Sequence, residues 1–115
     1  MRILLVDDNR EVREALRLRI QFVDEGWDVR EAATLTDARK MLGEECADLL
    51  VLDWEMPGAA DPRTFAALRA CCPGIRLIVL SGYPDNQAQA VKAGGDAFIS
   101  KTDPPERIIA TLRGM

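Results

Sequence analysis

Four short apolar runs, each followed by a polar residue, constrain the fold of this chain more than any other feature. Segments with helical periodicity separate the runs, and this rhythm is typical of parallel strands joined by helices. Because the carboxyl ends of parallel strands meet along one rim of a sheet, the residues that follow the runs are expected to converge there. The runs are ILLV at 3–6, LLVL at 49–52, LIVL at 77–80 and AFIS at 97–100, and the residues that follow them are Asp7, Asp8, Asp53, Ser81 and Lys101.

Five strands alternating with five helices are predicted along the chain, a βαβ series of the α/β class. Right-handed crossovers in such a series favour a doubly wound parallel sheet, for which the strand order 2-1-3-4-5 is one common solution and the one predicted for this chain. The second strand alternates in polarity and is expected at an edge of the sheet. The predicted strands are residues 2–6, 27–32, 48–53, 75–81 and 96–100.

The predicted helices begin at capping residues and turn an apolar face toward the sheet. The predicted caps are Asn9, Thr36, Asp61 before Pro62, and Asp103, whose spacing to Glu106 is that of a capping box. The first helix is expected to end at Gly26 and to carry the apolar residues Val12, Leu16, Ile20 and Val23. The fourth helical segment, 84–93, has a thin apolar face of Ala88 and Val91, so weak docking is expected.

Strands 1 and 3 are neighbours in this order, so Asp7, Asp8 and Asp53 are expected to crowd together. Like charges at close range repel and raise one another's pKa, and a divalent cation relieves this repulsion. Oxygen ligands without histidine or thiolate select a hard ion such as Mg²⁺, with Mn²⁺ as the alternative. Lys101 supplies a compact positive charge, and the Ser81 hydroxyl can donate to a phosphoryl oxygen. A carboxylate that attacks phosphorus forms an acyl phosphate, an established covalent strategy.

Each of these residues also has an ordinary structural explanation. Asp7 and Asp8 could end a strand and cap a helix, and for that pair alone the two interpretations are about equal. Ser81 before Gly82 is a common turn, and one lysine at a strand end is usually solvated. The joint arrangement favours function, because chance rarely places all these groups at the same end of alternating strands.

Composition limits the class of protein. The 115 residues are close to the size of one domain, and the net charge of −4 weighs against a nucleic-acid surface. No apolar stretch approaches the roughly 20 residues that span a bilayer and no secretory signal is visible, so a cytoplasmic domain without membrane contact is expected. The absence of histidine removes the commonest general base and zinc ligand. Cys46, Cys71 and Cys72 are an odd count with an adjacent pair, so reduced thiols are expected.

Four segments carry a resemblance to a known family: ILLVDDN at 3–9, LLVLDWEMPG at 49–58, LIVLSGY at 77–83 and GGDAFISK at 94–101. Over residues 1–115 the chain resembles a receiver domain of bacterial two-component response regulators, which has a flavodoxin-like fold. The resemblance implies that Asp53 accepts a phosphoryl group from a sensor histidine kinase or a phosphotransfer protein. It also implies a downstream output domain or protein as partner, a homodimer as a further option, and no nucleic-acid contact through this domain.

The same resemblance implies how the acidic residues would divide the work of holding magnesium. Asp8 would ligate the ion directly, and Asp7 would assist through water. Asp53 would be both a ligand and the phosphoacceptor. The backbone carbonyl of Glu55 would supply a further ligand.

The resemblance further implies a switch. Ser81 and Lys101 would hold the phosphoryl oxygens, and Phe98 matches the family's switch aromatic, whose ring swings inward when Ser81 moves toward the phosphate. A core aromatic on a strand is the structural alternative for Phe98. Where the family usually has a proline after the lysine, often with a cis bond, this chain has Thr102. A cis bond there would cost ~3 kcal/mol, so a trans link is expected.

Three functions remain open from the sequence. A phosphorylation-controlled switch is favoured by the full set of site residues. A degenerate receiver that acts as a phosphorylation-independent interaction module is the alternative, because the loop at 58–62 is unusual and the fourth helix is thin. A magnesium-dependent phosphohydrolase is a distant third, because the DWE segment has no second aspartate two residues after Asp53 and no cap domain is present.

Overall fold

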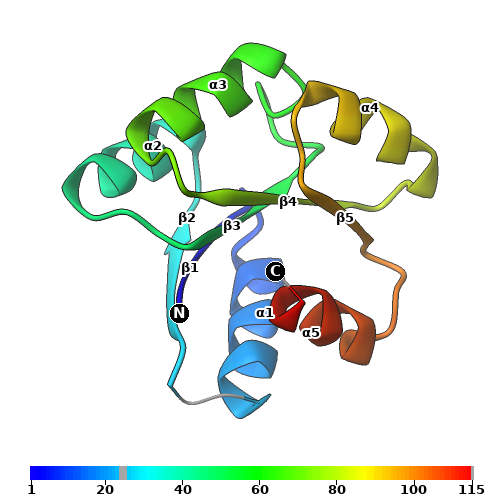
Figure 1. The fold of residues 1–115 in the computed structure, drawn as a ribbon. Helices are drawn as coiled ribbons and strands as arrows, with labels where there is room; N and C mark the ends of the chain where they lie inside the picture. The colour runs from blue at the N-terminus through cyan, green and yellow to red at the C-terminus, as the bar shows by residue number, and fades with distance from the viewer. Residues whose placement is uncertain (24–25, 115) are drawn as a thin grey trace.

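The computed structural model describes residues 1–23 and 26–114 and contains a five-stranded parallel sheet. Its strands are β1 (Arg2–Val6), β2 (Asp28–Ala32), β3 (Leu49–Asp53), β4 (Arg76–Ser81) and β5 (Ala97–Ser100). Their order across the sheet is β2-β1-β3-β4-β5 (Figure 1). The predicted doubly wound arrangement is therefore confirmed, with β2 at an edge.

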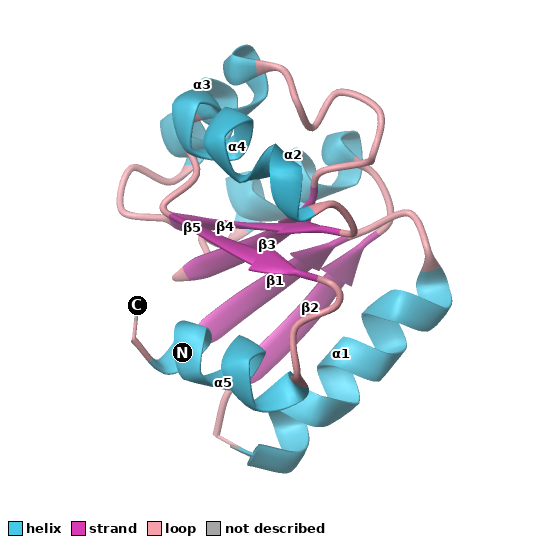
Figure 2. Ribbon diagram, turned by 90° about the vertical axis from the view of Figure 1, so that its right-hand side faces the viewer, coloured by secondary structure: helices cyan, strands magenta, loops and turns pink. Residues whose placement is uncertain are grey.

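Helices cover both faces of the sheet. They are α1 (Arg10–Val23), α2 (Leu35–Glu44), α3 (Pro62–Cys71), α4 (Gln87–Ala93) and α5 (Pro105–Arg113), with a short 3-10 turn η1 (Pro84–Asn86) before α4. The helices α2, α3 and α4 lie on one side, and α1 and α5 lie on the other (Figures 1 and 2). This layering leaves the carboxyl ends of the strands to the loops.

Successive strand residues enter two hydrophobic cores, one on each side of the sheet. Leu4 and Val6 of β1 belong to the core that includes residues of α2 and α3. Ile3 and Leu5 of the same strand belong to the core that includes residues of α1 and α5. A central strand must therefore be apolar on both faces, which explains why β1, β3 and β4 are continuous apolar runs in the sequence.

The first helix follows its prediction at its start. Asn9 Oδ1 accepts a hydrogen bond from a backbone N–H of the first turn at 3.2 Å. Ile20 is buried, whereas Val23 in the last turn is 39% exposed and does not belong to the buried face. The predicted end at Gly26 involves residues 24 and 25, which lie outside the described residues.

The second helix begins earlier than predicted. Its cap is Thr34, whose Oγ1 accepts a hydrogen bond from the Asp37 N–H at 3.0 Å, so the prediction of Thr36 is wrong. The two threonines flank Leu35, and both have a side chain suited to a cap. The helix starts at Leu35, so Thr34 holds the cap position and Thr36 lies inside the first turn. The Asp61 cap of α3 is confirmed, because its Oδ1 accepts from a backbone N–H at 2.9 Å.

The fifth helix begins without the predicted capping box. Pro104 holds the cap position and forms no side-chain cap bond. The Asp103 carboxylate accepts a hydrogen bond from the Ser100 N–H at 3.0 Å and lies 3.7 Å from the Arg107 guanidinium. The prediction for Asp103 and Glu106 is wrong because the turn from β5 already uses this carboxylate.

The apolar face of the fourth helix is as narrow as predicted, but a different residue of the helix is buried against the sheet. Ala90 is its buried residue, whereas Ala88 is exposed and Val91 is 55% exposed. The prediction treated 84–93 as one helix, but the first three residues form the tighter turn η1. A 3-10 turn has fewer residues per turn than an α-helix, so the phase of α4 is shifted.

The expectation of three reduced thiols is wrong for two of the cysteines. Cys46 and Cys72 form a disulfide, and Cys71 is free and exposed. Cys46 follows α2 and Cys72 follows α3, and these helices pack side by side. The adjacency of Cys71 and Cys72 in the sequence therefore misled the prediction, because the tertiary contact brings Cys46 to only one of them.

Two further predictions concern single features. No helix in the described part of the chain is both long and apolar enough to cross a membrane. The described peptide bonds include no cis bond, so the predicted trans link between Lys101 and Thr102 is confirmed.

Candidate functional site

Three carboxylates from two adjacent strands meet at the carboxyl end of the sheet. β1 pairs with β3 so that Val6 lies opposite Leu52, which places the residues after these two at the same level. Asp7, Asp8 and Asp53 each offer an oxygen within 4.8 Å of the others. Asp7 and Asp53 are buried, with 5% and 4% exposure, whereas Asp8 is exposed. The structure thus brings together the acidic residues that the sequence placed at strand ends.

The ionised form of Asp7 is destabilised by its surroundings in this cluster. Burial raises the pKa of its carboxyl to about 6, the negative charge of Asp53 adds to the rise, and the Asn9 N–H and the Lys101 charge oppose it. The Asn9 N–H donates to Asp7 Oδ1 at 2.9 Å. Asp7 Oδ2 is buried and accepts no hydrogen bond from any residue that the structure describes. A buried oxygen left in this way is an acceptor that a cation would satisfy.

Lys101 brings the compensating charge. β4 pairs with β5 so that Ser81 lies opposite Ser100, and the Lys101 N–H donates to the Ser81 carbonyl at 2.7 Å. Its Nζ lies 3.0 Å from Asp53 Oδ1 and 3.9 Å from Asp7 Oδ2. Burial alone would lower the pKa of Lys101, but the hydrogen bond to Asp53 and the surrounding carboxylates raise it.

Ser81 ends β4 and is fully buried, with 0% exposure. Its Oγ donates to Glu55 Oε1 at 3.1 Å and accepts from the Tyr83 N–H at 3.0 Å and from Asn86 Nδ2 at 3.2 Å. Glu55 also accepts from the Gly82 N–H at 2.6 Å. The hydroxyl therefore lies at the site but is engaged with the Glu55 side chain, a contact that the sequence did not indicate.

Phe98 lies on β5 opposite Val79 and is half-buried. Its ring packs against the core on the side of α2, α3 and α4. This position suits a core aromatic as well as a switch residue, so the switch role of Phe98 stays a prediction. Trp54 beside Asp53 is 7% exposed and forms an edge-on contact with Phe65 at 6.3 Å between ring centroids.

Arg13 is a site residue that the sequence did not reveal. Its Nη1 donates to the Asp7 carbonyl at 2.6 Å, and its Nε lies 3.2 Å from Glu31 Oε1. Its side chain is 13% exposed, and Arg17 one turn later binds the same glutamate at 3.0 Å. The sequence shows that the two arginines are four residues apart on α1. Their shared partner, Glu31, lies on β2 and is known only from the structure.

The donor set fits a hard divalent cation. Asp7, Asp8 and Asp53 supply only oxygen atoms, and their mutual repulsion is partly offset by one ammonium group. Oxygen-rich sites of this kind prefer Mg²⁺ or a similar ion over softer metals. A carboxylate placed between such an ion and a lysine can act as a nucleophile toward phosphorus.

Comparison with known proteins identifies the family of the chain. A family model described as the response regulator receiver domain matches residues 3–113. The phosphate regulon transcriptional regulatory protein PhoB of Pseudomonas aeruginosa is 28% identical over 117 residues, which cover 98% of this chain and 50% of that protein. The response regulator MprA of Mycobacterium avium is 32% identical over 117 residues, which cover 100% of this chain and 50% of that protein. The chain thus spans about half the length of these curated relatives.

Solved structures agree with the family match. A CheY-like response regulator receiver domain protein from Methanospirillum hungatei aligns with a TM-score of 0.83 and 26% identity, over 98% of this chain and 90% of that one. A response regulator protein from Burkholderia pseudomallei, solved with a phosphorylated aspartic acid and a calcium ion, aligns with a TM-score of 0.78 and 30% identity, over 96% of this chain and 65% of that one. This chain belongs to the family of response regulator receiver domains, which are signalling domains of two-component systems.

Proposed function

We propose that residues 1–115 form a cytoplasmic receiver domain in which Asp53 accepts a phosphoryl group from the phosphohistidine of a sensor kinase or a phosphotransfer protein. The observation that carries this proposal is the distance of 3.0 Å between Lys101 Nζ and Asp53 Oδ1, in a carboxylate cluster whose members Asp7 and Asp53 are buried. An ammonium group in this place lies within reach of a phosphoryl oxygen on the same carboxylate. The phosphorylated aspartic acid of the Burkholderia pseudomallei relative supports the same assignment.

The transfer is a substitution at phosphorus. An Asp53 carboxylate oxygen forms a new P–O bond while the P–N bond to the imidazole breaks, and the imidazole nitrogen keeps the electron pair of that bond. Lys101 holds one phosphoryl oxygen, and the Ser81 hydroxyl donates to another once it is released from its present partner. Ser81 and Lys101 lie at the ends of the neighbouring strands β4 and β5. Phosphorylation of Asp53 would therefore alter contacts at the ends of both strands.

A divalent cation would complete the charge balance. Mg²⁺, or Mn²⁺ in its place, would be held by Asp7, Asp8, Asp53 and the backbone carbonyl of Glu55. When bound, it neutralises the carboxylates and the incoming phosphoryl oxygens. Asp7 Oδ2 is buried and accepts no hydrogen bond from the described residues, and this feature of the chain favours such an ion.

The phosphorylation signal would reach a partner through the surface that includes α4, a helix held on the sheet by few contacts. Among the described residues of α4, Ala90 alone is buried, so few contacts hold this helix on the sheet. Phosphorylation of Asp53 would shift Ser81 and Phe98 and thereby bias two packings of α4, β5 and α5. The downstream output domain or protein would read this surface. Relatives about twice as long as this chain are consistent with an output domain elsewhere in such proteins.

An intact-mass experiment tests the proposal. Incubation with acetyl phosphate and Mg²⁺ should add one phosphoryl group to the wild-type protein and none to Asp53→Asn. Asp28→Asn is the matched control, because it makes the same charge change at the opposite end of the sheet and should be phosphorylated like the wild type. An adduct on Asp53→Asn, or none on the wild type, would refute the assignment.

The two other functions considered from the sequence are not favoured. A phosphorylation-independent interaction module has no need of the nucleophile, the hydroxyl and the ammonium group that Asp53, Ser81 and Lys101 bring to one end of the sheet. A phosphohydrolase acting on external substrates does not fit a family of signalling domains.

A further inference from the structure

The Glu55 side chain bridges two loops at the carboxyl end of the sheet. Its Oε1 accepts hydrogen bonds from the Gly82 N–H at 2.6 Å and from the Ser81 hydroxyl at 3.1 Å. Glu55 lies two residues after Asp53 in the loop that follows β3, whereas its two donors lie at the end of β4. The loop of the proposed phosphoacceptor is thus tied to the loop that leads into η1 and α4.

This contact uses the proton that Ser81 would need for a phosphoryl oxygen. The Ser81 hydroxyl has one proton to donate, and its acceptors are the Glu55 carboxylate at 3.1 Å and the Tyr83 carbonyl at 3.3 Å. The carboxylate is closer and charged, so it is the stronger acceptor. The lone pairs of the same oxygen receive the Tyr83 N–H and the Asn86 side chain. While Glu55 stays in place, Ser81 has no free donor.

The Glu55 carboxylate and a phosphoryl group on Asp53 would also repel each other electrostatically. The Glu55 carboxylate belongs to the loop directly after Asp53, whose Oδ1 accepts from the Glu55 N–H at 3.3 Å, so its negative charge lies at the same end of the sheet as those of Asp53 and Asp7. A phosphoryl group on Asp53 brings further negative charge to the same place, and like charges at short range repel. The carboxylate and the phosphoryl group therefore compete for the proton of the Ser81 hydroxyl and cannot both accept it.

We propose that Glu55 is an internal anionic latch, whose carboxylate occupies the Ser81 hydroxyl and the Gly82 N–H at rest and is displaced when Asp53 is phosphorylated. The inference rests on the proposed function, since it assumes a phosphoryl group at Asp53. Displacement of Glu55 removes its hydrogen bonds to the start of the loop that leads into η1. The helix α4, in which Ala90 is the buried residue, can then change its position on the sheet. Glu55 is a positioning residue that acts through Ser81.

The resting contact is tested without any phosphoryl donor. In a two-dimensional ¹⁵N NMR spectrum of the metal-free protein, the Gly82 amide proton should resonate downfield, as expected for a short bond to a carboxylate. It should move upfield in Glu55→Ala and by a smaller amount in Glu55→Gln, which keeps the shape and loses the charge. Asp85→Asn, an exposed carboxylate in η1, is the matched control and should leave the resonance in place. An unchanged Gly82 resonance in Glu55→Ala would overturn the latch.

The competition is tested by the rate of phosphorylation with acetyl phosphate and Mg²⁺. Both Glu55→Gln and Glu55→Ala should be phosphorylated several-fold faster than the wild type, and Asp85→Asn should match the wild type. An adduct that forms on the wild type at the same rate as on both Glu55 variants, or faster, would overturn the latch and leave the proposed function intact. No adduct on any of the proteins would overturn both.

Discussion

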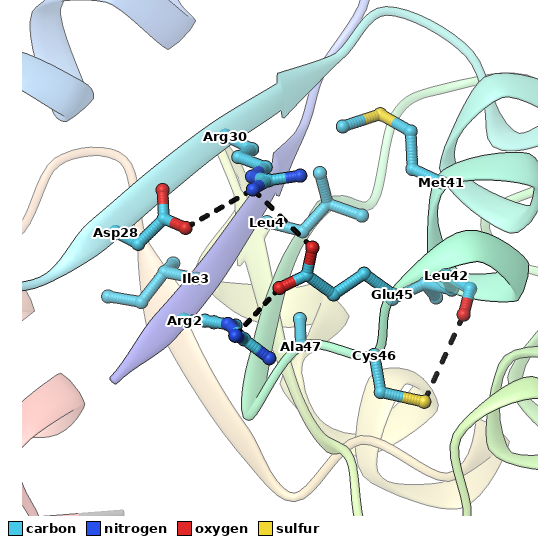
Figure 3. A pocket seen from close by; sticks show the side chains of 10 residues that line it. All are labelled: Arg2, Ile3, Leu4, Asp28, Arg30, Met41, Leu42, Glu45, Cys46 and Ala47. Carbon is cyan, nitrogen blue, oxygen red and sulfur yellow. Dashed lines mark hydrogen bonds and ion pairs between the residues drawn. The ribbon is translucent and has the colours of Figure 1, made fainter.

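The amino end and the carboxyl end of the sheet hold charged side chains in opposite ways. At the amino end, the Arg2 guanidinium lies 2.8 Å from the Glu45 carboxylate, and that of Arg30 lies 3.6 Å from Glu45 and 3.5 Å from Asp28 (Figure 3). These side chains are 38–56% exposed, so water screens them and each charge has an opposite partner. The arrangement is electrically satisfied as it stands.

At the carboxyl end, charges of one sign are buried together. Asp7 and Asp53 are nearly inaccessible, and Lys101 is the ammonium group that approaches both. Burial strengthens the repulsion that water would otherwise screen. Charges that are exposed and paired can have a purely structural role. Like charges that are buried together repel one another, and a bound cation would relieve this repulsion. If so, changes at the amino end should alter stability alone, and changes at the carboxyl end should alter ligand binding.

Reduction of the Cys46–Cys72 disulfide should have the largest effect on stability. Cys46 lies beside Arg2 and Glu45 at the amino end (Figure 3). The bond joins residues 26 apart in the sequence. A crosslink of this span restricts the unfolded chain, so reduction should lower the free energy of unfolding by about 3 kcal/mol. Urea denaturation with and without dithiothreitol measures this loss, and Cys71→Ser in both samples prevents exchange with the neighbouring thiol. Magnesium affinity should not change, and a marked change would contradict the separation of the two ends.

Asp7→Asn should have the next largest effect, and it should stabilise the metal-free protein. The pKa of Asp7 is raised from 3.8 to about 6 in the folded state, so the folded protein binds the proton more tightly than the unfolded chain does. The stability that this group contributes is therefore present below about 3.8 and is lost as pH rises through about 6. Above that range the substitution should raise the free energy of unfolding by on the order of 2–3 kcal/mol.

Urea denaturation at a series of pH values without metal measures this gain. Asp28→Asn at the amino end is the matched control, because it makes the same change to a carboxylate that is 47% exposed and paired with Arg30. The control should give no gain that grows between pH 4 and pH 6. A stability curve for Asp7→Asn that runs parallel to the wild type would show that burial of Asp7 carries no penalty.

Glu45→Gln should have the smallest effect. Glu45 bridges Arg2 and Arg30, but all three side chains are substantially exposed. Exposed ion pairs contribute little, so the free energy of unfolding should fall by less than about 1 kcal/mol. Added salt should reduce the difference further, because screening weakens the pair in the wild type. A loss above about 2 kcal/mol would mean that the amino end depends on these charges as strongly as a buried network does.

Much of the fold could be predicted because the central strands are buried on both faces. The run ILLV at 3–6 suits a strand that is buried on both faces, and its alternation with helical segments and further apolar runs favours a doubly wound sheet. The helix starts and the phase of α4 could not be predicted as well. Thr34 rather than Thr36 caps α2, although both threonines suit a cap. Ala90 rather than Ala88 is buried in α4, because the preceding 3-10 turn shifts the phase.

The site divides in the same way. Asp7, Asp53 and Lys101 were predicted to meet because each directly follows or ends a strand, and strand ends have fixed places. The roles of Arg13 and of the Glu55 side chain could not be predicted. Each depends on how far a long side chain reaches from a helix or a loop, and spacing along the chain carries no record of that.

The sequence by itself determined the series of parallel strands and the chemical groups at their carboxyl ends, because apolar runs and the residues after them follow from local pattern and from the geometry of parallel sheets. Only the tertiary structure decided that Cys46 bonds with Cys72 and that Glu55 holds Ser81. Those contacts join segments that are distant along the chain. Whether two such groups come within bonding distance depends on the packing of loops and helix ends, which no local pattern encodes.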